Sequence, residues 1–447
     1  MKRYDFNQDW TCQSLKTGET IPVTLPHDAM RTEQRVNTSM GEGNIGWFEG
    51  GDYEYRKTFT LEPELTGKKL LLEFESVYHN AEVWVNGQKA MYRPYGYTNF
   101  YVELNDFLQE GENEIRVIAK NADQPNSRWY SGTGIFRPVW LWAAGEKHIT
   151  INGVKIETLG ISPARIRVRV ETSVPGDANL EILDGSTVVA KASGKKEFVL
   201  EIPNAKLWNV DTPNLYTARV AFGDDVVEEV FGIRTLTWTP AKGVAINGER
   251  VVIRGACIHH DNGLLGAATS PEAEERRIRI LKESGYNSVR SAHNPASKYL
   301  LDACDRLGII VLQDMVNNGP YSFLGDTAIP NVRLLIGDNR KSFRDDRKMH
   351  RDRKTRARFL DRMTETVRQL SSFPCILLWT IFNEGWGQFD SVAVAGKLRA
   401  LDDGRLIDAA SGWFDNGAGD VTSIHVYNRA YRHLPSEKPI LLSECGG

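Results

Sequence analysis

The chain has 447 residues, of which 41% are hydrophobic and 25% are charged, and its formal net charge at pH 7 is −3. This length predicts roughly two to four domains. The near-neutral charge does not favour a protein that binds nucleic acid or a membrane surface as a whole, and no run of the sequence is long and apolar enough to span a bilayer. We therefore expect neither nucleic acid nor a membrane as a partner.

The five cysteines are scattered, odd in number and without the spacing of a metal site. Such thiols are typical of a reducing compartment. The first residues, Met1 to Phe6, contain no apolar segment of the kind that a secretory signal carries. We expect a cytoplasmic protein with reduced cysteines.

The first third of the chain, residues 1–146, is predicted to be all β. Short segments such as 69–74 and 81–85 alternate apolar and polar residues, and turn signals such as Asn86-Gly87 separate them. No helical periodicity persists over a useful length. The pattern favours a β-sandwich of the jelly-roll type.

Residues 147–237 continue with strand patterns. The segments 166–170 and 217–221 alternate well, and Pro175-Gly176-Asp177 marks one of the turns between strands. About ninety residues of this kind are typical of a small immunoglobulin-like β-sandwich.

Residues 238–447 differ, because strand-like runs now alternate with helical ones. This alternation predicts a parallel (β/α)8 TIM barrel. Only seven strands are visible, so we expect a truncated chain whose barrel lacks its final βα unit. The resulting unpaired edge between the first and seventh strands favours instability or oligomerisation. The predicted strands span 252–258, 287–290, 309–313, 376–383, 406–410, 422–426 and 439–443.

Two glutamates stand at the ends of two apolar runs. Glu384 ends the run 376–384, and Glu444 ends the run 439–444. A carboxylate at the end of a buried parallel strand lies where α/β barrels place their chemistry. Two carboxylates in one pocket are what retaining glycoside hydrolysis needs, one as acid/base and one as nucleophile. Salt bridges at the barrel mouth are the alternative interpretation of these glutamates.

Several motifs that are weak one by one follow each other in a fixed order. They are Leu25-Pro26-His27-Asp28, Val85-Asn86-Gly87, Ser131-Gly132-Thr133-Gly134-Ile135-Phe136-Arg137-Pro138-Val139, Asn247-Gly248, Arg254-Gly255, Val289-Arg290-Ser291-Ala292-His293-Asn294-Pro295, Phe382-Asn383-Glu384 and Ser443-Glu444. In this order the chain resembles glycoside hydrolase family 2, the β-galactosidase and β-glucuronidase family. The resemblance implies a sugar-binding sandwich, an immunoglobulin-like sandwich and a catalytic barrel. It also implies an oligosaccharide or glycoconjugate substrate and no cofactor.

The resemblance implies that Glu384 is the acid/base and Glu444 the nucleophile. The nucleophile must be ionised at neutral pH, so it needs hydrogen-bond donors or positive charge nearby. The acid must start protonated, so we expect the negative partner and partial burial to raise the pKa of Glu384. Asn383 is expected to bind the sugar 2-hydroxyl and to orient the nucleophile, with a loop cap as the alternative.

Other substrate-binding residues are expected from the same resemblance. His259 and His293 correspond to histidines that contact the sugar, although structural histidines are the alternative. Tyr427 corresponds to a tyrosine that hydrogen-bonds the nucleophile. Arg290 would lower the pKa of the nucleophile, and a structural ion pair is an equal alternative. Trp386 is either a stacking platform for the substrate or a core residue.

The chain departs from the magnesium-dependent β-galactosidases after the third barrel strand. Their Glu-x-His motif is replaced by Asp314-Met315-Val316, so we predict no required metal and expect Asp314 to line the pocket. Arg128 occupies the position of a substrate-binding aspartate of those galactosidases. β-Glucuronides and other β-glycosides therefore stay open as substrates.

Residues 340–358 hold ten basic and three acidic residues. A solvated loop and helix is favoured over a nucleic-acid patch, because Phe343 is the single Phe, Tyr or Trp among the charges. We predict a retaining β-glycoside hydrolase, most like a β-galactosidase, with β-glucuronidase or another β-glycosidase as the alternative. A carbohydrate-binding fragment without turnover is a second alternative, because an incomplete barrel would hold Glu444 loosely. The oligomeric state stays open, with a homo-oligomer among the alternatives.

Overall fold

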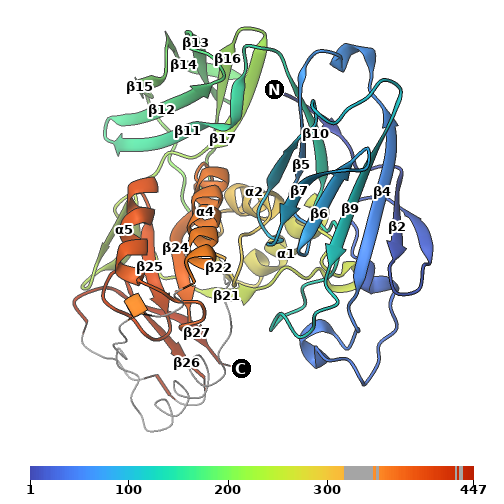
Figure 1. The fold of residues 1–447 in the computed structure, drawn as a ribbon. Coiled ribbons are helices and arrows are strands. Elements are labelled where there is room, and N and C mark those ends of the chain that lie inside the picture. The colour runs from blue at the N-terminus through green and yellow to red at the C-terminus, as the bar shows by residue number, and fades with distance from the viewer. Residues whose placement is uncertain (317–345, 349–351, 428–429, 432–435, 447) are drawn as a thin grey trace.

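The computed structural model describes residues 1–316, 346–348, 352–427, 430–431 and 436–446. These residues form two β-sandwiches followed by a parallel βα sheet, so the predicted order of the three folds is confirmed (Figure 1). In Figure 1 the second sandwich lies above the βα part and the first sandwich lies beside it.

The first sandwich consists of two antiparallel sheets with the strand orders β3-β2-β4-β9-β6-β7 and β1-β10-β5-β8. Alternation explains the packing: every second side chain of β9 is buried, and Leu72, Phe74 and Val117 contribute to the core. The elements are β1 Lys2–Asp5, β2 Trp10–Ser14, β3 Thr20–Val23, β4 Asp52–Thr60, β5 Lys69–Phe74, β6 Ala81–Val85, β7 Gln88–Arg93, β8 Phe100–Glu103, β9 Glu112–Lys120, β10 Val139–Ala144, and the short 3₁₀ turns Ala29–Thr32, Glu42–Ile45 and Pro63–Leu65.

The second sandwich has one sheet of order β11-β12-β15 and another of order β14-β13-β16-β17. Their inward residues, including Ile166, Val168, Leu180 and Val220, form a separate core. The strands are β11 Ile149–Ile161, β12 Ala164–Thr172, β13 Ala178–Asp184, β14 Thr187–Gly194, β15 Glu197–Glu201, β16 Tyr216–Phe222 and β17 Asp225–Phe231.

The βα part begins with a small meander and continues with all seven predicted strands. The order β21-β22-β23-β24-β25 forms one parallel sheet, and β26-β27 forms a parallel pair. The elements are β18 Leu236–Thr239, β19 Gly243–Ile246, β20 Glu249–Arg250, β21 Gly255–Ile258, α1 Pro271–Glu283, β22 Ser288–Ser291, α2 Lys298–Leu307, β23 Ile310–Asp314, α4 Arg353–Leu370, β24 Ile376–Asn383, α5 Ser391–Leu401, β25 Leu406–Ser411, β26 Thr422–Val426, β27 Ile440–Cys445, and the 3₁₀ turns Gly263–Leu265 and Asp346–Lys348.

Local signals in the sequence set where these elements begin and end. The hydroxyls of Ser270 and Ser297 and the carboxylate of Asp352 accept hydrogen bonds from the first turns of α1, α2 and α4. Gly308 ends α2 with φ 68°, a left-handed conformation that suits glycine. All eight side chains of β24 are buried, which is typical of a strand covered on both faces.

The strands β21 and β27 lie at the edges of separately hydrogen-bonded sheets in the described ranges. A cavity of about 660 Å³ lies between them, lined by apolar residues such as Leu312, Leu378 and Leu441. The thiol of Cys257 on β21 approaches the carbonyl oxygen of Ser443 on β27 at 3.8 Å. Instability or oligomerisation at this edge remains a prediction.

The first sandwich is fixed against the βα part by polar contacts. Arg93 at the end of β7 forms an ion pair of 2.7 Å with Glu365 on α4. Arg137 donates to the carbonyl oxygen of Pro295 at 3.0 Å, and Asp28 accepts from the backbone of Ala267 at 2.8 Å. These contacts hold the segment before β10 at the C-terminal ends of the parallel strands.

The basic cluster 340–358 lies partly outside the described residues. Its last part begins α4, where Arg353 and Lys354 are exposed and Arg358 is half-buried. None of the helices in the described ranges combines the length and the apolar character that crossing a bilayer requires.

Candidate active site

The two predicted carboxylates converge at one edge of the parallel strands. Glu384 directly follows β24, Glu444 lies near the end of β27, and Tyr427 directly follows β26. Parallel strands bring their carboxyl ends to the same edge of a sheet, which is where barrel enzymes bind substrate. The architecture therefore explains how residues from three separate strands meet.

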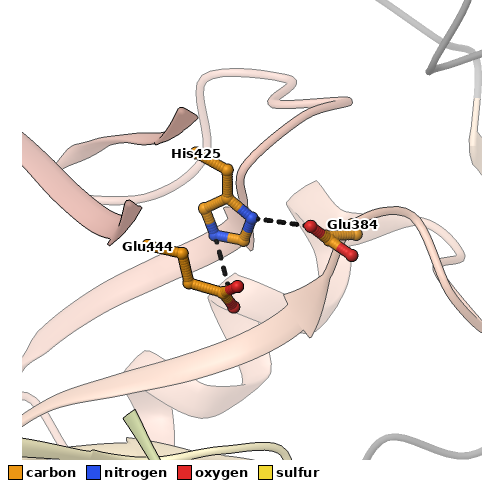
Figure 2. A group of neighbouring side chains, drawn as sticks. All are labelled: Glu384, His425 and Glu444. Carbon is orange, nitrogen blue, oxygen red and sulfur yellow. Dashed lines mark hydrogen bonds and ion pairs between the residues drawn. The ribbon is translucent and has the colours of Figure 1, made fainter. Parts of the chain in front are cut away.

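One histidine lies between the two carboxylates. Figure 2 shows the ring of His425, a residue of β26, with one nitrogen towards each glutamate. Its Nδ1 is 2.9 Å from Oε1 of Glu384, and its Nε2 is 3.8 Å from Oε1 of Glu444. One carboxylate oxygen of each glutamate and one ring nitrogen all lie within 4.8 Å of one another.

Tyr427 bridges the same two carboxylates. Its hydroxyl is 2.6 Å from Oε1 of Glu384 and 2.6 Å from Oε2 of Glu444. Burial, followed by the charges of the two glutamates, raises the pKa of Tyr427 far above its ordinary value, so the phenol keeps its proton. A phenol has a single proton, and two short contacts to carboxylates need a second one.

The pKa of Glu384 is shifted opposite to the expected direction. Burial is the largest influence and raises it, but the hydrogen bond and charge of His425, then Tyr427 and Arg128, outweigh burial and lower the pKa to about 2. The expectation of a raised pKa was therefore wrong, because it considered only burial and the negative partner. The lowered pKa belongs to the arrangement in which His425 and Tyr427 contact Glu384 directly.

A buried arginine holds the other carboxylate. Arg290 on β22 donates to Oε1 of Glu444 at 2.6 Å, to both oxygens of Asp314 at 2.9 and 2.8 Å, and to Oδ1 of Asn383 at 2.8 Å. Burial lowers the pKa of Arg290, but Asp314 and Glu444 outweigh burial and raise it. The guanidinium thus lies in direct contact with Glu444 and pairs with its carboxylate.

Asp314 orients other side chains instead of facing the pocket with a free oxygen. It is buried, and besides Arg290 it contacts Nδ1 of His293 at 3.1 Å. Burial raises the pKa of Asp314, but the charge of Arg290 and the contact with His293 outweigh burial and lower it. The Asp314 carboxylate therefore fixes the side chains of Arg290 and His293.

Aromatic rings cluster beside the carboxylates of the candidate site. Trp129 stacks on His259 with ring centroids 5.6 Å apart and an interplanar angle of 7°. It also contacts His293 at 5.5 Å and Trp386 at 6.3 Å between centroids. The guanidinium of Arg128 lies 4.2 Å from the centroid of the Trp386 ring. Flat aromatic faces next to histidines are suited to the C–H faces and hydroxyls of a sugar.

The side-chain amide of Asn383 uses its oxygen in a hydrogen bond, whereas its nitrogen has no partner among the described residues. Its Oδ1 accepts from Arg290, whereas its buried Nδ2 has no hydrogen-bond partner within the described part of the chain. The same holds for Nδ1 of His259. Burial, followed by the charge of His293, lowers the pKa of His259, so its ring is neutral at neutral pH. A buried donor without a partner costs free energy unless a ligand satisfies it.

All nine residues singled out in the sequence lie in this region: Glu384, Glu444, Asn383, His259, His293, Arg290, Tyr427, Trp386 and Asp314. Sequence reasoning did not select His425 or Trp129. The signal for His425 was present, because residues two apart in a strand face the same side and His425 precedes Tyr427 by two. No feature of the sequence around Trp129 distinguished it from the other tryptophans.

The set Glu384, His425 and Glu444 also contains ligand types that a metal ion binds. All three groups are already engaged with each other, with Tyr427 or with Arg290. The guanidinium of Arg290 next to Glu444 opposes a further positive charge at this point. Independence of metal remains a prediction.

Replacing His425 by asparagine is expected to raise the pKa of Glu384 towards its ordinary value. The asparagine amide retains a donor near the position of Nδ1 but carries no charge, and the ring contact is the main influence that lowers this pKa. If Glu384 acts as the acid, the alkaline limb of the pH dependence of kcat/KM moves to higher pH by about one unit or more. His148→Asn, at a buried histidine of the second sandwich, is the matched control. An unmoved limb in His425→Asn would contradict the assignment.

Comparison with known proteins gives the same architecture. The glycosyl hydrolase 2 galactose-binding domain-like model matches residues 10–139, the glycosyl hydrolases family 2 model matches 147–234, and the family 2 TIM barrel domain model matches 240–443. Together these matches cover most of the chain.

Individual relatives match over the same region. The β-galactosidase BoGH2A of Bacteroides ovatus is 36% identical over 349 residues, which is 70% of this chain and 41% of that protein. The β-glucuronidase of Bacteroides fragilis is 27% identical, over 82% of this chain and 54% of its own length. A solved family 2 glycosyl hydrolase of Bacteroides cellulosilyticus aligns with a TM-score of 0.79 and 25% identity, covering 95% of this chain and 56% of that one.

The chain thus spans about half the length, or less, of these relatives. The three family models nevertheless follow one another in the order of the three folds, and the barrel model extends across both β24 and β27. The chain belongs to glycoside hydrolase family 2.

Proposed function

We propose that the chain carries the catalytic site of a retaining β-glycoside hydrolase, most like a β-galactosidase. The observation that supports this most directly is the pair of carboxylates within 4.8 Å of each other. Retaining enzymes place their carboxyl groups about 5–5.5 Å apart, whereas inverting enzymes leave about 6.5–9.5 Å for a water molecule. The short separation favours double displacement.

In the first step Glu444 attacks the anomeric carbon and the glycosidic C–O bond breaks. Glu384 donates a proton to the departing oxygen, so the leaving group departs as a neutral alcohol. His425 and Tyr427 both contact Glu384, which supports a role for them in delivering the proton to it. Arg290 holds the Glu444 carboxylate by a hydrogen bond until the covalent bond forms.

In the second step water attacks the same carbon and the bond to Glu444 breaks. Glu384 is now a carboxylate and takes the proton of the water, which restores both groups. Tyr427, whose hydroxyl is 2.6 Å from both carboxylates, stabilises Glu444 as it leaves. Nδ2 of Asn383 is placed to donate to a sugar hydroxyl. These roles for Asn383, His259, His293 and Trp386 are part of the proposal.

A panel of aryl β-glycosides tests the proposal: galactoside, glucuronide, glucoside, mannoside and fucoside. We expect turnover of one member, and nuclear magnetic resonance should show the β-anomer of the sugar as the first product. An α-anomer would overturn the retaining mechanism. β-Glucuronide turnover would select the alternative that Arg128 at the pocket entrance supports.

Binding of one of the five free sugars, without hydrolysis of any of the aryl glycosides, would instead support a carbohydrate-binding role. The cavity between β21 and β27 favours this alternative, because it borders the strand that carries Glu444.

We also propose a cytoplasmic location. The support is that all five cysteines are free, three of them buried and two exposed. Alkylation of the protein in intact cells tests this, and oxidised thiols at Cys257 or Cys445 would argue against a reducing compartment.

A further inference from the structure

A second pocket shares two tryptophans with the candidate active site. It has a volume of about 290 Å³ and lies between the first sandwich and α4, near the lower end of ligand-binding pockets in proteins. Trp129 and Trp386 line it and also form the wall of the catalytic site. The sandwich adds the tyrosines 78, 95 and 97. A ligand in this pocket would therefore be continuous with a sugar between Glu384 and Glu444.

The charge of this pocket is positive. Arg358 and Arg362 of α4 line it, and no aspartate or glutamate does so among the described residues. Arg362 is paired with Glu365 at 2.9 Å, but Glu365 is shared with Arg93. Arg358 is half-buried and has no ion pair or hydrogen bond within the described ranges. A partly buried cation without a partner favours an anion as ligand.

The pocket also has an unused hydrogen-bond donor. Asn294 is 1% exposed, and its Oδ1 accepts from the hydroxyl of Tyr95 at 2.5 Å. Its Nδ2 has no hydrogen-bond partner in the part of the chain that the structure describes. A buried amide donor without a partner becomes favourable when a ligand oxygen accepts from it. Asn294 and Arg358 both lack a hydrogen-bond acceptor, and the charge of Arg358 favours an acceptor that is negatively charged.

The pocket lies on the side of Glu384. Arg128 contacts Oε2 of Glu384 at 3.4 Å and lies over the ring of Trp386, which lines the pocket. Arg290, which contacts Glu444 and not Glu384, does not line it. An acid/base carboxyl faces the oxygen of the leaving group. The pocket is therefore on the side where the leaving group lies.

We propose that this pocket is a leaving-group subsite for an acidic sugar, which is a sugar ring that carries a carboxylate or a sulfate ester. The tyrosines and tryptophans pack against the ring, Asn294 binds an oxygen, and Arg358 binds the negative group. The subsite deepens the proposed function, since it names the chemistry of the substrate next to the bond that is cleaved. The argument for the leaving-group side rests on the assignment of Glu384.

The test uses glucose, glucuronate and glucose 6-sulfate as probes at constant ionic strength. Single sugars occupy the pocket whatever the glycone is, and Trp129 and Trp386 make tryptophan fluorescence a direct readout. We expect one or both acidic sugars to bind about tenfold more tightly than glucose, as one hydrogen bond to a charged group provides. The two acidic probes distinguish a carboxylate from a sulfate ester as the natural group.

Arg358→Ala should remove this preference for the acidic sugar, and Arg358→Lys should keep part of it. Arg353→Ala is the matched control, because Arg353 is exposed at the start of the same helix and does not line the pocket. Equal affinity for glucose and both acidic sugars, or an equal loss in Arg358→Ala and Arg353→Ala, would overturn the proposal. Glycoside hydrolysis is measured separately. Turnover without charge preference overturns only this subsite, and charge preference without turnover overturns only the proposed catalysis.

Discussion

Replacing Glu444 by glutamine is expected to lower kcat/KM for an activated aryl β-glycoside by roughly 10⁴-fold or more. Glutamine has nearly the shape of glutamate and still accepts from Arg290, whose Nη1 is 2.6 Å from the carboxylate. Its amide oxygen is not nucleophilic enough to attack the anomeric carbon. Initial rates and thermal unfolding, measured on the same preparations, separate a loss of chemistry from a loss of fold.

Glu384→Gln should behave differently from Glu444→Gln. An activated aryl leaving group departs without a proton, so the first step persists, whereas the second step lacks its base and slows. Added azide then attacks the glycosyl-enzyme and yields a β-glycosyl azide. In Glu444→Gln azide replaces the nucleophile and yields the α-glycosyl azide. The azide anomer therefore identifies the role of each carboxylate.

Exposed Glu249 on β20 provides the control for these variants. Glu249→Gln should hydrolyse the glycoside at the rate of the unmodified protein. Unchanged hydrolysis in Glu384→Gln and Glu444→Gln would remove both carboxylates from the mechanism. Exchange of the two azide anomers would reverse their roles.

The strands of the fold could be predicted because their patterns are local. The run that became β24 is apolar over its whole length, and each parallel strand of the βα part is separated from the next by a segment of helical or loop character. The position of Glu384 at the barrel mouth then follows from the direction of the strands. Neither the prediction of the strands nor the position of Glu384 requires knowledge of contacts between residues far apart in the sequence.

The electrostatics of Glu384 could not be predicted in this way. The contacts that lower its pKa come from His425 and Tyr427, 41 and 43 positions later, and from Arg128, 256 positions earlier. No pattern of neighbouring residues in the sequence indicates that these three side chains contact the Glu384 carboxylate. Burial and the nearby negative charge were visible in the sequence, and both pointed in the wrong direction.

Asp314 and Trp129 show the same limit at the level of single residues. That Asp314 lines the pocket remains a prediction, and the sequence did not indicate that Arg290 and His293 would contact its oxygens. Trp129 lies in a loop of the first sandwich and reaches the site because that sandwich packs against the βα part. Domain packing, which sequence periodicity does not encode, decides the position of Trp129, and contacts between neighbouring strands decide that of Asp314.

Arg290→Met is expected to cost about 3–5 kcal/mol of the free energy of unfolding at pH 7 and to abolish hydrolysis. The guanidinium is 3% exposed and compensates Asp314 and Glu444 at 2.8 and 2.6 Å. Methionine fills similar space without charge, so two carboxylates remain near each other without their cation. Urea unfolding, followed by tryptophan fluorescence, measures the loss. Adding Asp314→Asn should recover part of it, because one of the two charges is then removed.

The pH dependence of this loss separates charge from packing. With Arg290 present, the lowered pKa of Asp314 contributes stability above the pKa of the unfolded chain, and this contribution is lost as the pH falls through the folded value. Without Arg290, burial and the neighbouring carboxylate raise the folded pKa values. Arg290→Met is then most stable below the unfolded pKa and loses stability as the pH rises. The deficit should be larger at pH 8 than at pH 4.5, and an equal deficit at both would mean that Arg290 acts through packing alone.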